Sequence, residues 1–168
     1  MIMVDVNMLV YIKAADVPQH ARAATWFEHA VRDRTRIGLP WQSLLGFVRI
    51  ITSARVCSQP LSIAQAWEQV KEWLALPAVW IPEPTDRHAQ VLGELLLSAN
   101  VGGNLVPDAH LAAIAIEHGL VVCSSDADFA RFSGVRWVNP LSESVMEPSA
   151  RYLARRARSG RDPSLRSG

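Results

Sequence analysis

The 168-residue sequence predicts an α/β protein with a parallel β-sheet. Short β-branched segments alternate along the chain with segments whose apolar residues recur at helical spacing, which is typical of strand–helix–strand units. Apolar residues make up 49% of the chain and charged residues 20%. This is the composition of a globular domain that buries a sizeable core, and it excludes a disordered or fibrous chain.

The first half of the chain contains three predicted strands and four predicted helices. The segment Ile2–Val6 is β-branched and Met-rich and has no turn residue, so it predicts a buried parallel strand. Ser62, followed three residues later by Gln65, forms a capping box that marks the start of a helix through Leu74. The other predicted elements are a short helix over Asn7–Ala14, a helix over His20–Arg32, a strand over Arg36–Leu39, a helix over Trp41–Ala54 and a strand over Ala78–Ile81.

The second half contains two further helices and two further strands. Thr85 is predicted to cap a helix that runs to about Ala99, and Gly102-Gly103-Asn104 predicts a loop. A helix over Asp108–His118 is expected to end at Gly119, because glycine accepts the left-handed conformation that stops helices. Strands over Leu120–Ser124 and Arg136–Val138 complete the sheet.

Four aspartates lie where predicted strands end or predicted helices begin. Asp5 lies near the carboxyl end of the first strand, and Asp108 lies at the start of a helix. Asp126 follows the fourth strand directly, and Asp128 is two residues further on. The carboxyl ends of parallel strands share one edge of the sheet, where ligands bind. Carboxylates gathered there repel one another unless a cation lies between them, and such oxygen ligands favour Mg²⁺ or Mn²⁺ over zinc.

Helix capping is the alternative explanation for two of these acids. Asp108 and Asp126 each stand where aspartate is favoured as an N-cap and where its charge suits the helix dipole. A carboxylate in a buried strand, as predicted for Asp5, is costly without a partner or a metal, and it favours a functional site. Asn7 could orient Asp5 or cap the first short helix, and capping is the favoured interpretation. The five histidines, which are scattered without ligand spacing, are interpreted as structural or surface residues.

Three segments, in this order and spacing, resemble the motifs of PIN domains. Val4–Leu9 resembles the opening V-D-x-N-x-L of that family, and Asp108–Ala113 resembles its D-A-x-L-A-A segment. Ser124–Phe129 resembles its T-x-D-x-D-F segment, with serine in place of threonine. The resemblance covers about residues 1–141, and the G-L-P-W run of Gly38–Trp41 is similar to one subset of the VapC toxins.

The resemblance implies a three-layer α/β/α fold with a five-stranded parallel sheet. It also implies endonucleolytic cleavage of RNA, of the tRNA or rRNA class, with bound Mg²⁺ or Mn²⁺. Asp5, Asp108 and Asp126 would then be the catalytic acids and metal ligands, with Asp128 as a further ligand. VapC-like toxins are typically inhibited by a VapB antitoxin and often form homodimers, so both partners are expected for this chain.

The chain departs from the family pattern in the third helix. PIN domains usually carry a glutamate three residues before an arginine there, and here Gly46 precedes Arg49. A catalytically inactive PIN domain that binds RNA or protein is therefore the alternative hypothesis. A phosphotransfer domain is disfavoured, because Asn7 stands where aspartyl phosphatases need a second aspartate and no lysine lies in residues 132–141, where receivers need one.

Charge divides the chain into a domain over residues 1–147 and a basic tail over residues 148–168. The first part holds 11 Lys or Arg against 15 Asp or Glu, whereas the second holds 6 Arg against a single acid. The tail predicts either contacts with RNA phosphates or a solvated, disordered segment. Cys57 and Cys123 predict reduced, buried thiols, and the chain shows no membrane span or signal peptide, so a cytoplasmic protein with no membrane partner is expected.

Overall fold

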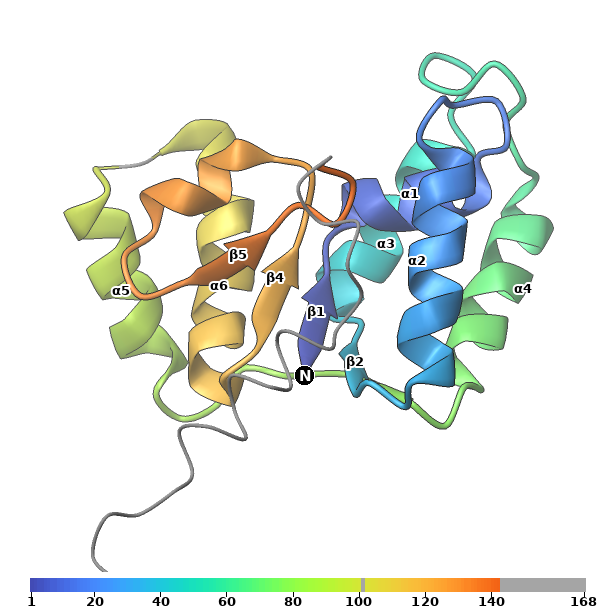
Figure 1. Ribbon diagram of the computed structural model, residues 1–168. Coiled ribbons are helices and arrows are strands. Elements are labelled where there is room, and N and C mark those ends of the chain that lie inside the picture. The colour runs from blue at the N-terminus through green and yellow to red at the C-terminus, as the bar shows by residue number, and fades with distance from the viewer. Residues whose placement is uncertain (101, 143–168) are drawn as a thin grey trace, which may run out of the picture.

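The computed structural model describes residues 1–100 and 102–142, which form a β-sheet between two layers of helices (Figure 1). The sheet has five strands, all parallel, in the order β3-β2-β1-β4-β5. The predicted fold class is therefore confirmed. The strands are β1 (Ile2–Val4), β2 (Ile37–Gly38), β3 (Val79–Trp80), β4 (Val121–Cys123) and β5 (Arg136–Val138).

Within the described residues, six α-helices and two short 3₁₀ helices connect the strands. The capping box at Ser62 is present with both of its hydrogen bonds, and Gly119 ends its helix with a φ of 64°. The helices are α1 (Val6–Lys13), α2 (His20–Arg32), α3 (Trp41–Ile51), α4 (Ile63–Leu74), α5 (His88–Ser98), η1 (Gly103–Leu105), α6 (Val106–His118) and η2 (Ala127–Arg131).

Neighbouring residues of β1 face two separate hydrophobic cores. Val4 packs with α1, α2, α3 and α4 on one face of the sheet, whereas Met3 packs with α5, α6 and η2 on the other. Successive side chains of a strand point to opposite faces, so one short central strand contributes to both cores. Figure 1 shows the two helical layers on either side of the sheet.

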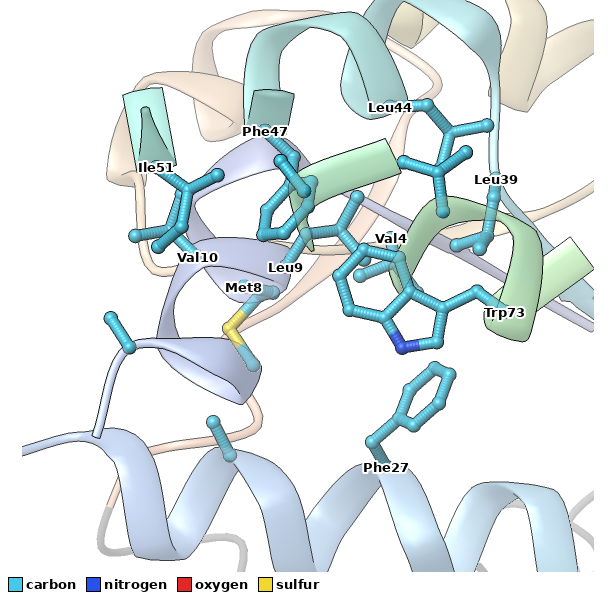
Figure 2. Packing of buried hydrophobic residues seen from close by; sticks show 14 of the residues in the cluster. Val4, Met8, Leu9, Val10, Phe27, Leu39, Leu44, Phe47, Ile51 and Trp73 are labelled. Carbon is cyan, nitrogen blue, oxygen red and sulfur yellow. The ribbon is translucent and has the colours of Figure 1, made fainter. Parts of the chain in front are cut away.

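An aromatic cluster fills the core on the α1–α4 side (Figure 2). The ring of Trp73 from α4 lies edge-on to Phe47 of α3, with the centroids 4.7 Å apart, and to Phe27 of α2, with the centroids 6.4 Å apart. Edge-to-face contacts of this kind add to the free energy gained from burying the rings. The three rings join α2, α3 and α4. These helices share one core with α1, which begins two residues after β1.

Several predicted boundaries were wrong by a few residues. The first strand ends at Val4 and not at Val6, because Val6 already begins α1. The third helix ends at Ile51 and not at Ala54. Gly103 and Asn104 of the predicted loop belong to the 3₁₀ helix η1. Local sequence sets such ends weakly, because terminal turns are stabilised by tertiary contacts as well as by propensity.

The connections place the carboxyl end of β1 at a branch point of the sheet. The chain runs from β1 to β2 and β3 on one side, and then crosses to β4 and β5 on the other side of β1. Connections that leave a central strand in opposite directions open a crevice at its carboxyl end, which is the usual ligand site of open α/β sheets. Asp5 is the first residue after this strand.

The predicted basic tail, residues 148–168, lies outside the described residues, and so does the predicted domain boundary at residue 147. Within residues 1–100 and 102–142, no helix combines the length and the apolar character needed to cross a membrane.

Candidate active site

Asp5 links the central strand to the first helix. Its carboxylate accepts a hydrogen bond from the backbone N–H of Val6 at 2.6 Å and caps α1. The other carboxylate oxygen accepts from the Ser124 hydroxyl at 2.7 Å. The residue is only 3% exposed, although it follows the strand instead of lying inside it as predicted. These hydrogen bonds compensate part of the cost of burying the carboxylate.

Ser124 joins three elements of the site through one hydroxyl. Besides donating to Asp5, its Oγ accepts hydrogen bonds from the Asn7 side-chain amide at 2.9 Å and from the Asp126 backbone N–H at 3.0 Å. A serine hydroxyl offers one donor and two acceptor positions, and all three are used here. The residue is fully buried. The sequence alone assigns no role to Ser124, although a hydroxyl directly after a buried strand is a signal for this position.

Asn7 does not cap the first helix, so that interpretation was wrong. Asp5 takes the capping position, and Asn7 lies one residue inside α1. Its amide group donates to Ser124 and its carbonyl oxygen accepts from the Ser125 backbone N–H at 3.4 Å. Asn7 therefore ties the start of α1 to the segment that follows β4, and it holds the two halves of the site in register.

Asp126 and Asp128 occupy the start of η2. The Asp126 carboxylate accepts from the Asp128 backbone N–H at 2.9 Å, so the capping explanation holds for Asp126. The Asp128 carboxylate lies 3.4 Å from the Arg131 guanidinium, and both of these side chains are about half exposed. An exposed pair of this kind contributes little to stability. The capping bond leaves other lone pairs of Asp126 available, because a carboxylate can accept about four hydrogen bonds.

Asp108 does not cap α6, because the helix begins two residues earlier, at Val106, and its N-cap has no side-chain hydrogen bond. Burial raises the pKa of Asp108 to about 6, with further contributions from the negative charges of Asp5, Asp126 and Asp128. Carboxylates raise each other's pKa only when they are close together. The structure thus gathers all four predicted acids at the carboxyl edge of the sheet.

Positive charge is scarce around this group of acids. Burial is also the main cause of the raised pKa of Asp5, with the charge of Asp126 adding to it and hydrogen bonds from Ser124 and Val6 opposing it. Within residues 1–100 and 102–142, the ion pair of Asp128 with Arg131 is the one contact of these four carboxylates with a basic side chain. Asp5, Asp108 and Asp126 therefore have no basic partner within the described residues.

The donor set suits a hard divalent cation, but the side chains do not form a complete cage. Among the described residues, no three Asp, Glu, His or Cys side chains lie in an arrangement that could hold a metal ion. Oxygen ligands and uncompensated negative charge are what Mg²⁺ and Mn²⁺ require. The metal assignment to Asp5, Asp108, Asp126 and Asp128 therefore stays a prediction.

Gly46 packs directly against the residue that follows Asp5. A Cβ atom added at Gly46 would lie 2.9 Å from Cγ2 of Val6, which is shorter than real Cβ contacts. The helices α1 and α3 therefore approach each other closely at this point. Position 46 adjoins the acid cluster, as the family resemblance implies for the missing glutamate, but the present packing leaves no room for a side chain there.

Two of the five histidines, which were predicted to be structural or surface residues, contact each other. His88 of α5 contacts the Glu117 carboxylate through Nδ1 at 2.9 Å, and its Nε2 lies 2.8 Å from Nδ1 of His110. His110 stands two residues after Asp108 on α6. Burial, followed by the neighbouring His88, lowers the pKa of His110. No spacing rule reveals this pair in the sequence, because its members lie 22 residues apart on two helices.

A cleft of about 340 Å³ lies beside the acids on the α1–α2 side. It contains the exposed guanidinium of Arg22, and Ser125 connects it to the Asp126 segment. Its lining residues are Tyr11, Pro18, Gln19, Arg22, Ser125, Asn139 and Leu141. A polar cleft with one cation at its wall suits an anionic ligand that extends away from the acid cluster.

The fold and the acid cluster agree with a family comparison. The family model described as "PIN domain" matches residues 2–135. The chain belongs to the PIN-domain family.

Within that family, the chain is similar to VapC proteins of Mycobacterium tuberculosis. It is 43% identical over 143 residues to Ribonuclease VapC33, covering 85% of this chain and all of that protein. It is 42% identical over 137 residues to Ribonuclease VapC37, covering 82% of this chain and 95% of that protein. A chain in the structure of VapBC2 from Rickettsia felis, bound to a DNA fragment from the promoter, aligns with a TM-score of 0.63 at 19% identity, covering 83% of this chain and 98% of that one.

Proposed function

We propose that this protein is a metal-dependent endoribonuclease that acts as the toxin of a toxin–antitoxin pair. The observation that carries the proposal is the group of four acids at the carboxyl edge of β1, three of which have no basic partner within the described residues. Such a group binds a divalent cation more readily than it serves any structural purpose, because its members destabilise one another when ionised. The names of VapC33 and VapC37 support a ribonuclease.

Asp5, Asp108, Asp126 and Asp128 would hold the Mg²⁺ or Mn²⁺. When bound, the ion would lower the pKa of a water molecule and offset negative charge on the phosphate. The chain's own residues prepare this site. Ser124 and the N–H of Val6 hold the Asp5 carboxylate in one orientation. Asn7 and Ser124 fix the Asp126 segment relative to α1, so that the acids from both ends of the sequence stay aligned.

The RNA strand would run over the sheet edge and into the cleft at Arg22. The guanidinium would pair with a phosphate, and the N-terminus of α6 would add partial positive charge beside Asp108. Both features would guide the backbone of the substrate toward the acids. We assign the substrate to structured RNA of the tRNA or rRNA class.

An antitoxin protein and a second copy of this chain are the proposed protein partners. The name of the VapBC2 complex supports an antitoxin, since it pairs a VapB with a VapC. An antitoxin side chain with a positive charge would compensate the acids in the place of a metal. Mixing the purified chain with a VapB-like protein should abolish cleavage, and light scattering of the chain alone should report a dimer.

The enzymatic proposal is tested by cleavage of purified tRNA and rRNA in the presence of Mn²⁺ or Mg²⁺. Cleavage should stop with EDTA and should fall at least a hundredfold in the Asp5→Asn variant, because loss of a charged group at the reacting centre costs several kcal/mol. Glu72→Gln removes an exposed acid of α4 and is the matched control. Cleavage that persists with EDTA and in Asp5→Asn would refute the metal mechanism.

Gly46 supports one alternative, an inactive PIN domain that binds RNA without cutting it. Introducing glutamate at position 46 tests it only if Val6 is shortened at the same time, because the two side chains would collide. A wild-type protein that binds RNA without cleavage, together with activity in the Val6→Ala/Gly46→Glu double variant, would establish this alternative. Activity of the wild type would exclude it.

A further inference from the structure

A second cleft, of about 240 Å³, lies between the start of α3, the segment that follows β3, and α6. The Gln42 side chain, which lines it, donates to the carbonyl oxygen of Pro107 at 2.9 Å, one residue before Asp108. The cleft therefore adjoins the acid cluster. Three of its lining residues are prolines, whose rings restrict the backbone φ angle. The lining residues are Pro40, Trp41, Gln42, Pro82, Glu83, Pro84, His110 and Ile114.

Trp41 supplies an exposed aromatic surface to this cleft. The residue is 40% exposed, although most of its indole ring is apolar. Trp67 of α4 stacks against it with ring centroids 6.5 Å apart and planes at 12°, but Trp67 does not line the cleft. Trp67 thus fixes the orientation of the Trp41 ring. An exposed, oriented indole is a surface on which nucleobases stack.

His110 is oriented by a series of hydrogen bonds that begins at Thr85. The side chain of Glu117 is only 1% exposed, and it accepts hydrogen bonds from Thr85 at 2.7 Å and from His88 at 2.9 Å. His88 in turn contacts His110 at 2.8 Å. Apolar residues of α5 and α6 already pack these helices together, so these hydrogen bonds are not needed to join them. Their effect is to fix the His110 imidazole, which borders the cleft.

The hydrogen-bonding groups of the cleft favour a ligand with donors on its edge. With both imidazoles neutral, His88 donates to Glu117 and accepts from Nδ1 of His110, which leaves Nε2 of His110 as an acceptor. Among the described residues, that Nε2 has no hydrogen-bond partner. The carboxylate of Glu83 is a second acceptor at the cleft. Guanine presents two adjacent donors, N1–H and the 2-amino group, on one edge.

We propose that this cleft binds one unpaired guanine of the RNA, next to the phosphodiester that is cut. The base stacks on Trp41, and its donor edge faces His110 and Glu83. The cleft volume suits a single base and is below the range of pockets that take larger ligands. This inference rests on the proposed ribonuclease function, because it assigns a base-recognition site to the same substrate.

The test uses an RNA hairpin library with a randomised loop, incubated with the full-length protein and Mn²⁺, with cut positions determined by sequencing. The wild type should cut next to guanine at one fixed loop position. Trp41→Ala and His110→Ala should remove this preference and slow cleavage of guanine-containing loops about tenfold, the size expected for loss of one stacked base. Trp41→Phe keeps an aromatic face and should retain the preference.

Leu97→Ala is the control, because it removes an exposed apolar side chain of α5 from outside the cleft. It should retain the guanine preference. Thermal melting confirms that each variant is folded before it is compared. Cleavage without guanine preference, or a preference that survives Trp41→Ala and His110→Ala, would overturn this inference. So would equal loss of dimerisation in the Trp41→Ala and Trp67→Ala variants with the preference intact. Absence of any wild-type cleavage would refute the proposed function itself.

Discussion

Ser124 donates a hydrogen bond of 2.7 Å to the carboxylate of Asp5, although the two residues stand 119 positions apart in the sequence. The bond joins the carboxyl ends of the neighbouring strands β1 and β4. Asp5 follows the first of these strands, and Asp126 and Asp128 follow the second. The serine is completely buried and uses all its hydrogen-bonding capacity. The geometry of the proposed metal site thus depends on a residue that is not itself a ligand.

Replacing Ser124 with alanine should lower the cleavage rate about 10- to 100-fold, the usual effect of removing a group that orients a ligand. The hydrogen bond from Ser124 lowers the pKa of Asp5, so the acid limb of the pH–rate profile should also move to higher pH. A merely structural defect would not shift that limb. Ser98→Ala, on α5, is the control and should leave the profile unchanged. An unshifted profile in Ser124→Ala would contradict this role.

Asp108→Asn should stabilise the protein when no metal is bound. The pKa of Asp108 is about 6 in the folded state against 3.8 as the ordinary value, so the folded state binds the proton more tightly. Stability therefore falls as pH rises from about 4 to 6, and the ionised carboxylate destabilises the fold above that range. After allowance for solvent screening, the gain from asparagine is on the order of 1 kcal/mol at neutral pH and vanishes below pH 4. Chemical denaturation in EDTA measures it.

The same substitution should have the opposite effect in excess Mn²⁺. A ligand that binds only the folded state stabilises it, by about 2.7 kcal/mol at a hundred times the Kd, and loss of Asp108 weakens this binding. The two measurements together separate repulsion among the acids from metal binding. Equal stability changes with and without Mn²⁺ would show that Asp108 is not a ligand.

The sequence predicts the layers of this fold and the gathering of its acids for a physical reason. Strand–helix alternation and the apolar segment around Val4 imply a parallel sheet, and a parallel sheet brings Asp5, Asp108 and Asp126 to one edge whatever the loops do. Exact register is not needed for that conclusion. The four acids were identified because topology alone places them together.

The finer contacts could not be predicted, since they depend on side-chain directions across the sheet and between helices. Asn7 was assigned to capping from its place before a helix, but Asp5 competes for the same N–H groups and wins. The pair of His88 and His110 forms only because α5 packs against α6 at a particular rotation. A one-dimensional pattern contains the spacing along each helix, but not the rotation of one helix against another.

Gly46→Ala should destabilise the protein by about 1 kcal/mol, even though alanine is the better helix former by about the same amount. The added Cβ would lie 2.9 Å from Val6, and overpacking of this kind typically costs about 1–3 kcal/mol. In a Val6→Ala background the clash disappears, so the same substitution should stabilise the protein. A double-mutant cycle from urea denaturation gives the coupling. Additive effects would show that α1 and α3 are free to move apart.

Ser43→Ala should stabilise the protein by about 1 kcal/mol. Ser43 lies in α3 and is only 1% exposed, and its hydroxyl has no hydrogen-bond partner among the described residues. An unsatisfied buried hydroxyl costs about 1–3 kcal/mol, and alanine removes it while adding helix propensity. Ser98→Ala is the control. The Ser98 hydroxyl has a partner, the carbonyl oxygen of Leu95 at 3.4 Å, so its loss should not stabilise the protein.

Gly46 lies one helical turn after Ser43, so cleavage should be measured alongside urea denaturation. A destabilised Ser43→Ala variant would mean that the hydroxyl binds a water molecule or a ligand in solution, and a simultaneous fall in cleavage would assign that partner to the acid site.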